Sequence, residues 1–117
     1  MIKLSKAGTL YTLTMNNGEN MICLDWQQRM LEILDKLEEA PVAGTAMVLI
    51  GEEKFFSNGL NLNVLNKLDG TGWILFAAQM NEIHRRMLML PFPTVAAVNG
   101  HAFAGGAFMA LSCDYRI

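Results

Sequence analysis

Two short apolar runs, residues 46–50 and 94–98, each follow a segment with the periodicity of an amphipathic helix. The helical segments span residues 25–39 and 72–90, and their apolar residues recur at the spacing of one helix face. A strand that is apolar at every position is typical of a sheet covered on both faces, because neither side of it meets solvent. The order of a helix followed by an apolar strand, which occurs twice, therefore predicts an α/β fold in which both runs are buried strands.

The N-terminal segment predicts a β-hairpin. Residues 2–4 and 10–15 alternate β-branched or aromatic residues with polar ones, and Ala7 and Gly8 lie between them. With the helix at 25–39, the hairpin forms a ββα unit that leads into the strand at 46–50. We expect a polar loop at 51–59, a short helix after Gly105 and the start of a strand at 115–117. No linker divides the chain, so its 117 residues fit one domain or part of one.

The composition argues against several classes of protein. Hydrophobic residues make up 52% of the chain and charged residues 17%, whereas disordered chains are rich in charge and poor in apolar residues. A net charge of -2 without a cluster of Lys or Arg argues against nucleic-acid binding. Without a recognisable signal peptide or an apolar run of about 18 residues, we expect a cytoplasmic protein that does not enter the membrane. Cys23 and Cys113 lie far apart, which suggests neither a disulfide framework nor a metal site.

Two glycine-containing turns, residues 55–62 and 99–107, are the strongest candidates for a site. Each comes after a predicted strand and before a helical segment. Glycine lets the backbone turn sharply and approach a ligand closely, and a helix that starts at Gly105 and Gly106 leaves N–H groups without intrahelical partners. Such N–H groups can stabilise the negative oxygen that forms in thioester chemistry. Taken singly, each turn is better explained by a tight turn and close helix packing.

Taken in order, these motifs resemble the crotonase (enoyl-CoA hydratase/isomerase) superfamily. The family pattern Phe-x-x-Gly-x-(Asp/Asn)-Leu matches residues 56–62, and its Pro-x-(Val/Ile)-Ala-Ala-(Val/Ile)-Asn-Gly, Gly-Gly and Cys-Asp elements match residues 93–114. The resemblance implies a crotonase-like ββα superhelix. It also implies that residues 1–117 are only the N-terminal part of that domain, truncated before its C-terminal half and inactive alone.

The resemblance assigns site residues in both turns. In the family pattern, the oxyanion N–H groups belong to the residue after the loop glycine and to the Gly-Gly turn, which implies Leu60 and Gly105. Leu60, Asn61, Leu62 and Asn63 are expected to line the acyl-CoA channel together with Gly105. Asn61 stands where the family commonly has Asp, so a carboxylate has no role at this position.

Phe108 stands where family hydratases have the first of two catalytic glutamates. Hydration needs one group to activate water and another to handle the α-proton, so this substitution argues against a hydratase. Isomerases of the family use one glutamate, whose position would lie past Ile117. The resemblance therefore implies a Δ3,Δ2-enoyl-CoA isomerase of fatty-acid oxidation. A hydratase, another crotonase activity such as thioester hydrolysis, and a non-catalytic acyl-CoA-binding or assembly module are the alternatives.

The remaining expectations concern histidines, cofactors and partners. His84 lies beside Arg85 and Arg86 in a predicted helix and is interpreted as a solvated or capped side chain, whereas His101 follows a strand end near the presumed site. No cofactor is expected, because coenzyme A is part of the acyl-CoA substrate. The resemblance also implies a homo-oligomer, a trimer or hexamer, or association with the missing C-terminal half.

Overall fold

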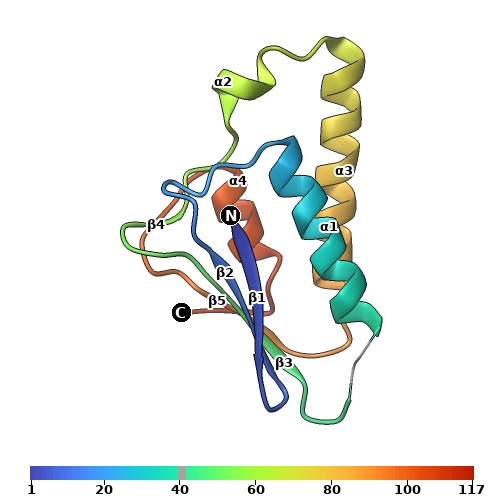
Figure 1. The fold of residues 1–117 in the computed structure, drawn as a ribbon, viewed down its shortest axis with the longest axis vertical. Helices are drawn as coiled ribbons and strands as arrows, with labels where there is room; N and C mark the ends of the chain where they lie inside the picture. The colour runs from blue at the N-terminus through green and yellow to red at the C-terminus, as the bar shows by residue number, and fades with distance from the viewer. Residues whose placement is uncertain (40–41) are drawn as a thin grey trace.

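The computed structural model describes residues 1–39 and 42–117, and its helices and strands alternate along the chain (Figure 1). The elements are, in chain order, β1 (Ile2–Ala7), β2 (Leu10–Met15), α1 (Leu24–Glu39), β3 (Ala46–Ile50), β4 (Phe55–Ser57), α2 (Leu62–Leu65), α3 (Gly70–Leu88), β5 (Thr94–Ala97), β6 (His101–Ala102), α4 (Gly105–Leu111) and β7 (Tyr115–Arg116). The predicted α/β fold, the hairpin, the two long helices and the short helix after the second turn are confirmed.

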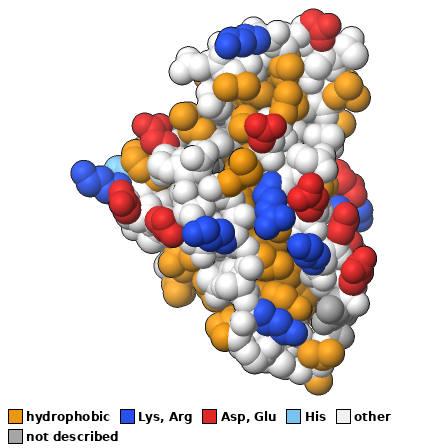
Figure 2. Space-filling model, viewed as in Figure 1, with side chains coloured by type: hydrophobic (Ala, Val, Ile, Leu, Met, Phe, Trp, Pro, Cys, Tyr) orange, Lys and Arg blue, Asp and Glu red, His pale blue; other side chains and the backbone are white. Residues whose placement is uncertain are grey.

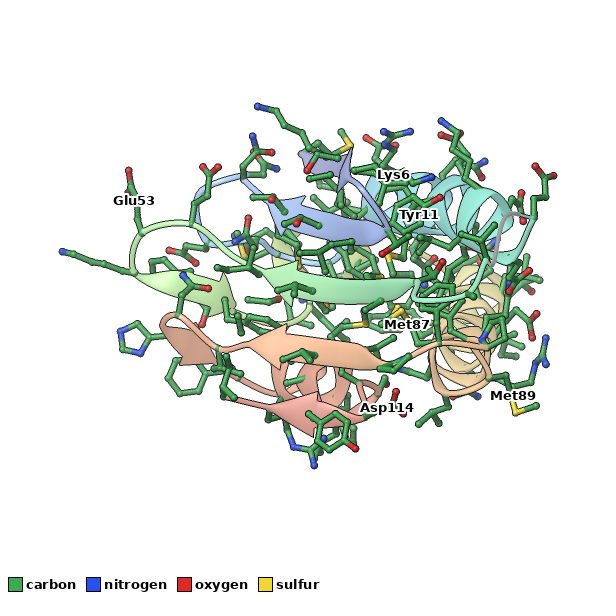
Figure 3. All side chains as sticks on the ribbon, turned by 90° about the horizontal axis from the view of Figure 1, so that it is seen from below. Lys6, Tyr11, Glu53, Met87, Met89 and Asp114 are labelled. Atoms are coloured by element: carbon green, nitrogen blue, oxygen red, sulfur yellow. The ribbon has the colours of Figure 1, made fainter. Side chains whose placement is uncertain are left out.

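The main sheet has the strand order β1-β2-β3-β5-β7, and Figure 3 shows these strands following one another across it. β1 and β2 form the antiparallel hairpin, whereas β2–β3, β3–β5 and β5–β7 pair in parallel. Parallel neighbours need long crossover connections, which here contain α1, α3 and α4. β4 and β6 pair separately as a small parallel sheet beyond the ends of β3 and β5.

The core forms where α1 and α3 lie side by side next to the sheet (Figure 1). One face of each helix is buried, as the apolar periodicity predicts, with Met30, Ile33, Leu34 and Leu37 from α1 and Phe76, Met80, Ile83 and Met87 from α3. α3 begins after Asp69, whose carboxylate accepts a hydrogen bond from the Gly72 N–H at 2.7 Å and so caps the helix.

The prediction that β3 and β5 are buried on both faces is wrong for this chain. Met47 and Leu49 of β3 are fully buried, but Val48 and Ile50 between them are only half-buried. β5 shows the same alternation. Successive side chains of a strand point to opposite faces, so one face of the sheet is covered more completely than the other by the described residues.

Short elements that the sequence analysis does not predict surround the first turn. β4 lies in the segment expected to be a polar loop, and α2 follows it directly. β4 is held by pairing with β6, more than forty residues later, through Phe55 to His101 and Ser57 to Ala102. Such a pairing leaves little trace in local sequence, because a three-residue strand shows no periodicity.

An ion-pair network on the outer surface connects α1 to α3. Arg86 of α3 donates hydrogen bonds to Asp35 at 2.7 Å and to both carboxylate oxygens of Glu38, at 2.7 and 2.8 Å. Only 12% of the Arg86 side chain is exposed, and these carboxylates raise the pKa of its guanidinium. Figure 2 shows acidic and basic side chains interspersed along the side where α1 lies, and apolar ones gathered over the upper part of this face.

We expect Arg86→Met to destabilise the protein by about 1 kcal/mol, because it removes a bidentate ion pair that is shielded from water on the arginine side. The loss should shrink at high salt, which screens the exposed carboxylates. Urea unfolding at low and high salt measures both effects. Arg85→Met is the matched control, since among the described residues Arg85 pairs with Glu82 of its own helix and both side chains are exposed. Equal unfolding midpoints for the two variants would show that the α1–α3 network contributes nothing.

Candidate active site

Leu60 is held in place by the segment that precedes α1. The Ile22 N–H donates to the Gly59 carbonyl at 2.8 Å, and the Asn61 N–H donates to the Ile22 carbonyl at 2.8 Å. In this parallel bridge the Gly59 carbonyl and the Asn61 N–H both point toward Ile22. The N–H of Leu60 lies opposite the Gly59 carbonyl in the same peptide group, so it points away from Ile22. That N–H has no acceptor among the described residues.

Gly105 and Gly106 open α4 and place its first turn against β4. A Cβ atom at Gly106 would overlap the carbonyl oxygen of Ser57 and lie 2.8 Å from its carbonyl carbon, so only glycine lets the helix approach this closely. Gly105 is the first residue of α4, and its N–H has no intrahelical acceptor. Ala104 before it has φ 44°, a left-handed conformation that is costly for a residue with a side chain.

The two turns meet at Gly59 and Gly105. A Cβ atom at Gly59, where φ is +85°, would lie 3.3 Å from the Gly105 nitrogen. A Cβ atom at Gly105 would lie 3.5 Å from Cδ2 of Leu60. Leu60 and Gly105 both line one pocket of about 390 Å³, and neither N–H has an acceptor in the described part of the chain. The structure thus brings together the two residues that the sequence assigns to oxyanion binding.

The pocket walls are mainly apolar and come from α3, α4 and the two turns. Its lining residues are Leu60, Trp73, Phe76, Ala77, Met80, Asn81, His84, Ala104, Gly105 and Phe108. Free N–H groups beside an apolar wall suit a ligand with one polar, electron-rich oxygen and an apolar chain. Phe108, which stands where family hydratases have a glutamate, contributes an uncharged ring to this wall.

The other predicted binding residues lie outside this pocket. Asn61 is the N-cap of α2, and its side-chain oxygen accepts a hydrogen bond from the Val64 N–H at 3.4 Å. Leu62 and Asn63 form the first turn of α2 and are exposed. They sit next to Leu60 in the chain, so their contact with the rest of an acyl-CoA molecule stays a prediction.

His84 is placed differently from its interpretation as a solvated or capped side chain. It lines the pocket, half-buried, and its Nδ1 lies 2.8 Å from Oγ of Ser112 in the segment after α4. Its ring meets that of Phe108 edge-on, with centroids 6.2 Å apart. Burial lowers the pKa of His84 from its ordinary value of 6.5, which favours the neutral imidazole at neutral pH.

His101, the other histidine considered in the sequence analysis, does not line the pocket. Its ring stacks on Phe103 at a centroid distance of 5.5 Å and lies 5.4 Å from the ring of Phe55.

Cys113 is buried, and burial raises the pKa of its thiol to about 11, so it is not a nucleophile at neutral pH. Within residues 1–39 and 42–117, no group of three or more His, Cys, Asp or Glu side chains could hold a metal ion. In the same ranges no helix has the length and apolar character needed to span a bilayer.

The sequence model of one protein family, described as enoyl-CoA hydratase/isomerase, matches residues 5–117. The chain belongs to the enoyl-CoA hydratase/isomerase family. This assignment confirms the resemblance of the two turns to the crotonase superfamily, and the family is one of enzymes.

Similarity to other members of the enoyl-CoA hydratase/isomerase family extends over almost the whole chain. The Arabidopsis thaliana protein named enoyl-CoA delta isomerase 3 is 36% identical over an alignment of 120 positions, which covers 98% of this chain and 50% of that protein. A putative enoyl-CoA hydratase of Thermus thermophilus is 35% identical over an alignment of 119 positions, which covers 97% of this chain and 46% of that protein. A crystal structure of an enoyl-CoA hydratase from Bacillus anthracis matches with a TM-score of 0.90 at 25% identity, over 98% of this chain and 46% of that one. The chain therefore spans about half the length of these relatives, and its fold is the N-terminal portion of the crotonase fold.

Proposed function

We propose that the full-length protein is a Δ3,Δ2-enoyl-CoA isomerase of fatty-acid oxidation that stabilises a thioester enolate with the N–H groups of Leu60 and Gly105. The main observation in support is that Leu60 and Gly105 line one apolar pocket and that neither N–H has an acceptor among the described residues. A thioester oxygen placed between them becomes negative when the C2 proton leaves, and donors aimed at that oxygen stabilise the charge. The apolar wall then takes the acyl chain.

Isomerisation fits this half of the site better than hydration does. Moving a double bond from C3 to C2 needs a proton taken from C2 and returned at C4, whereas hydration needs a second group to activate water. Phe108 offers no such group, and the relative at 36% identity is named an enoyl-CoA delta isomerase. The relative named a putative hydratase, at 35% identity, makes hydration the second candidate.

Assays of the full-length gene product with 3-enoyl-CoA and 2-enoyl-CoA test this proposal. We expect conversion of the 3-enoyl to the 2-enoyl thioester, and hydration of the 2-enoyl thioester slower by about two orders of magnitude or more, the effect of lacking one acid–base group. Comparable turnover in the two reactions would contradict the isomerase assignment in favour of a hydratase. Tight binding of acyl-CoA without either reaction would support a non-catalytic module.

A further inference from the structure

Gln27 is a polar side chain on the buried face of α1. It lies among the apolar residues through which this helix packs, and 0% of Gln27 is exposed. Its Nε2 donates a hydrogen bond to the backbone carbonyl of Phe76 in α3 at 2.9 Å. Because a carbonyl can only accept, the amide nitrogen must face it, and Oε1 is left without a donor among the described residues. Gln27 therefore links two helices inside the core, with one of its own polar atoms unpaired.

Stability alone does not account for this hydrogen bond. The Phe76 carbonyl lies inside α3, where it already accepts the N–H of Met80 four residues later. An apolar residue in place of Gln27 would leave that carbonyl paired and would remove the orphaned Oε1, an exchange that is nearly neutral or favourable in a core. What the bond specifies is the position of α3 against α1 at Phe76.

Phe76 is the point where α3 begins to pack, and it belongs to the pocket wall. It is the first buried residue of the helix, whereas Ile74 and Leu75 just before it are 71% and 61% exposed. The Phe76 ring meets the Trp73 ring edge-on at a centroid distance of 6.0 Å, and both residues line the pocket. A shift of α3 at Phe76 would therefore move two aromatic side chains of the wall.

The hydrogen bond of Gln27 is one of two links between α1 and α3, which lie side by side (Figure 1). The other is the network of Arg86 with Asp35 and Glu38, closer to the C-terminus of α3 and exposed on its carboxylate side. Of the side-chain hydrogen bonds between these helices in the described residues, that of Gln27 is the buried one. It fixes the N-terminal part of the wall, where the Arg86 network does not reach.

We propose that Gln27 is a positioning residue that sets the acyl-chain selectivity of the pocket, a role that rests on the proposed function. It acts through Phe76 and Trp73, whose rings form the wall against which the acyl chain lies. A fixed wall discriminates between chains, because one methylene more or less in an apolar pocket changes kcat/KM by about 10- to 200-fold. The proposed oxyanion donors Leu60 and Gly105 lie in other elements, so the chemical step itself does not use Gln27.

Kinetics of the full-length protein with Gln27→Met, over 3-enoyl-CoA substrates of increasing chain length, test this role. Methionine is close to glutamine in shape but cannot donate to the Phe76 carbonyl. We expect the preference for the best chain length over its neighbours to fall by about tenfold, the smaller effect of one methylene. The change should come from KM, with kcat for the best substrate little altered. Gln28→Met is the matched control, since Gln28 is exposed and bonds to Glu32 of its own helix.

Unfolding measurements separate positioning from a purely structural role. Gln27→Met should unfold at the denaturant concentration of the native protein or above it, so its altered selectivity does not come from partial unfolding. Gln27→Leu is the second apolar variant and should give the same result if Gln27→Met does not fold. Native chain-length selectivity in a folded variant, with or without a lower unfolding midpoint, would overturn the role of Gln27 and leave the isomerase assignment intact. A native protein without isomerase activity at any chain length would overturn both.

Discussion

Gly105→Pro is expected to lower kcat/KM for 3-enoyl-CoA by about 10² to 10³ in the full-length protein, the effect of losing one oxyanion donor. Proline has no N–H, so the substitution removes the proposed donor itself. Gly105 is the first residue of α4, a position where proline is well tolerated because this N–H makes no intrahelical bond. Ala104 before it, with φ 44° and ψ −113°, is outside the right-handed helical region that a following proline disfavours.

Gly70→Pro is the matched control for this substitution. Gly70 is also the first residue of a helix, Asp69 before it is extended, and a Cβ atom there would meet nothing within 4 Å. Its isomerase activity should equal that of the native protein. Thermal unfolding of both variants tests for a loss of fold, since a Cβ atom at Gly105 lies 3.2 Å from the flexible end of Ile22. A folded Gly105→Pro enzyme with activity near that of Gly70→Pro would remove Gly105 from the oxyanion site.

The long elements of this fold are readable from sequence because each has its own local pattern. The helical spacing of apolar residues in α1 and α3 predicts both the extent of these helices and their buried faces. The alternation of apolar and polar residues predicts the β1–β2 hairpin. β4 and β6 have no such pattern, since each is two or three residues long and exists through pairing with the other. The half-covered face of β3 escapes prediction for a related reason, because an apolar run does not say what packs on either side of it.

The residues of the candidate site differ in the same way, since some have a local sequence signal and others are brought to the site only by the fold. Leu60 and Gly105 can be predicted because their glycine turns match a family pattern, and their meeting in space follows from the fold. His84 is missed, although a signal exists. It lies four residues after Met80 and one after Ile83, at the edge of the buried face of α3. Its partner Ser112 is 28 residues away, and no local pattern reveals that contact.

Asn61 shows how a local role can be overlooked in favour of a functional one. The family resemblance assigns it to the substrate channel, but its side chain accepts a hydrogen bond from the Val64 N–H and begins α2. Asparagine is among the preferred N-cap residues, so the sequence contains the information for this helix start. The side chain of Asn61 therefore has a structural role at the start of α2, and its contact with the substrate stays a prediction.

Gly106→Ala is expected to destabilise the protein on the order of 3 kcal/mol, a large effect for one methyl group. The added Cβ would overlap the Ser57 carbonyl oxygen, and backbone atoms cannot move aside as the end of a flexible side chain can. Either α4 or β4 must shift. A shift would also separate Gly105 from Gly59, so the remaining folded enzyme should lose activity as well.

Gly70→Ala makes the same chemical change where a Cβ atom meets nothing, at the start of a helix and without a left-handed backbone. It should leave stability unchanged or raise it by up to about 1 kcal/mol, because alanine loses less conformational entropy than glycine on folding. Denaturant unfolding of the two variants gives the difference directly. The contrast matters for the site, because the free N–H of Gly105 depends on a helix start that only Gly106 allows so close to β4. If Gly106→Ala and Gly70→Ala unfold at the same denaturant concentration, that close approach is not what positions the proposed oxyanion donor.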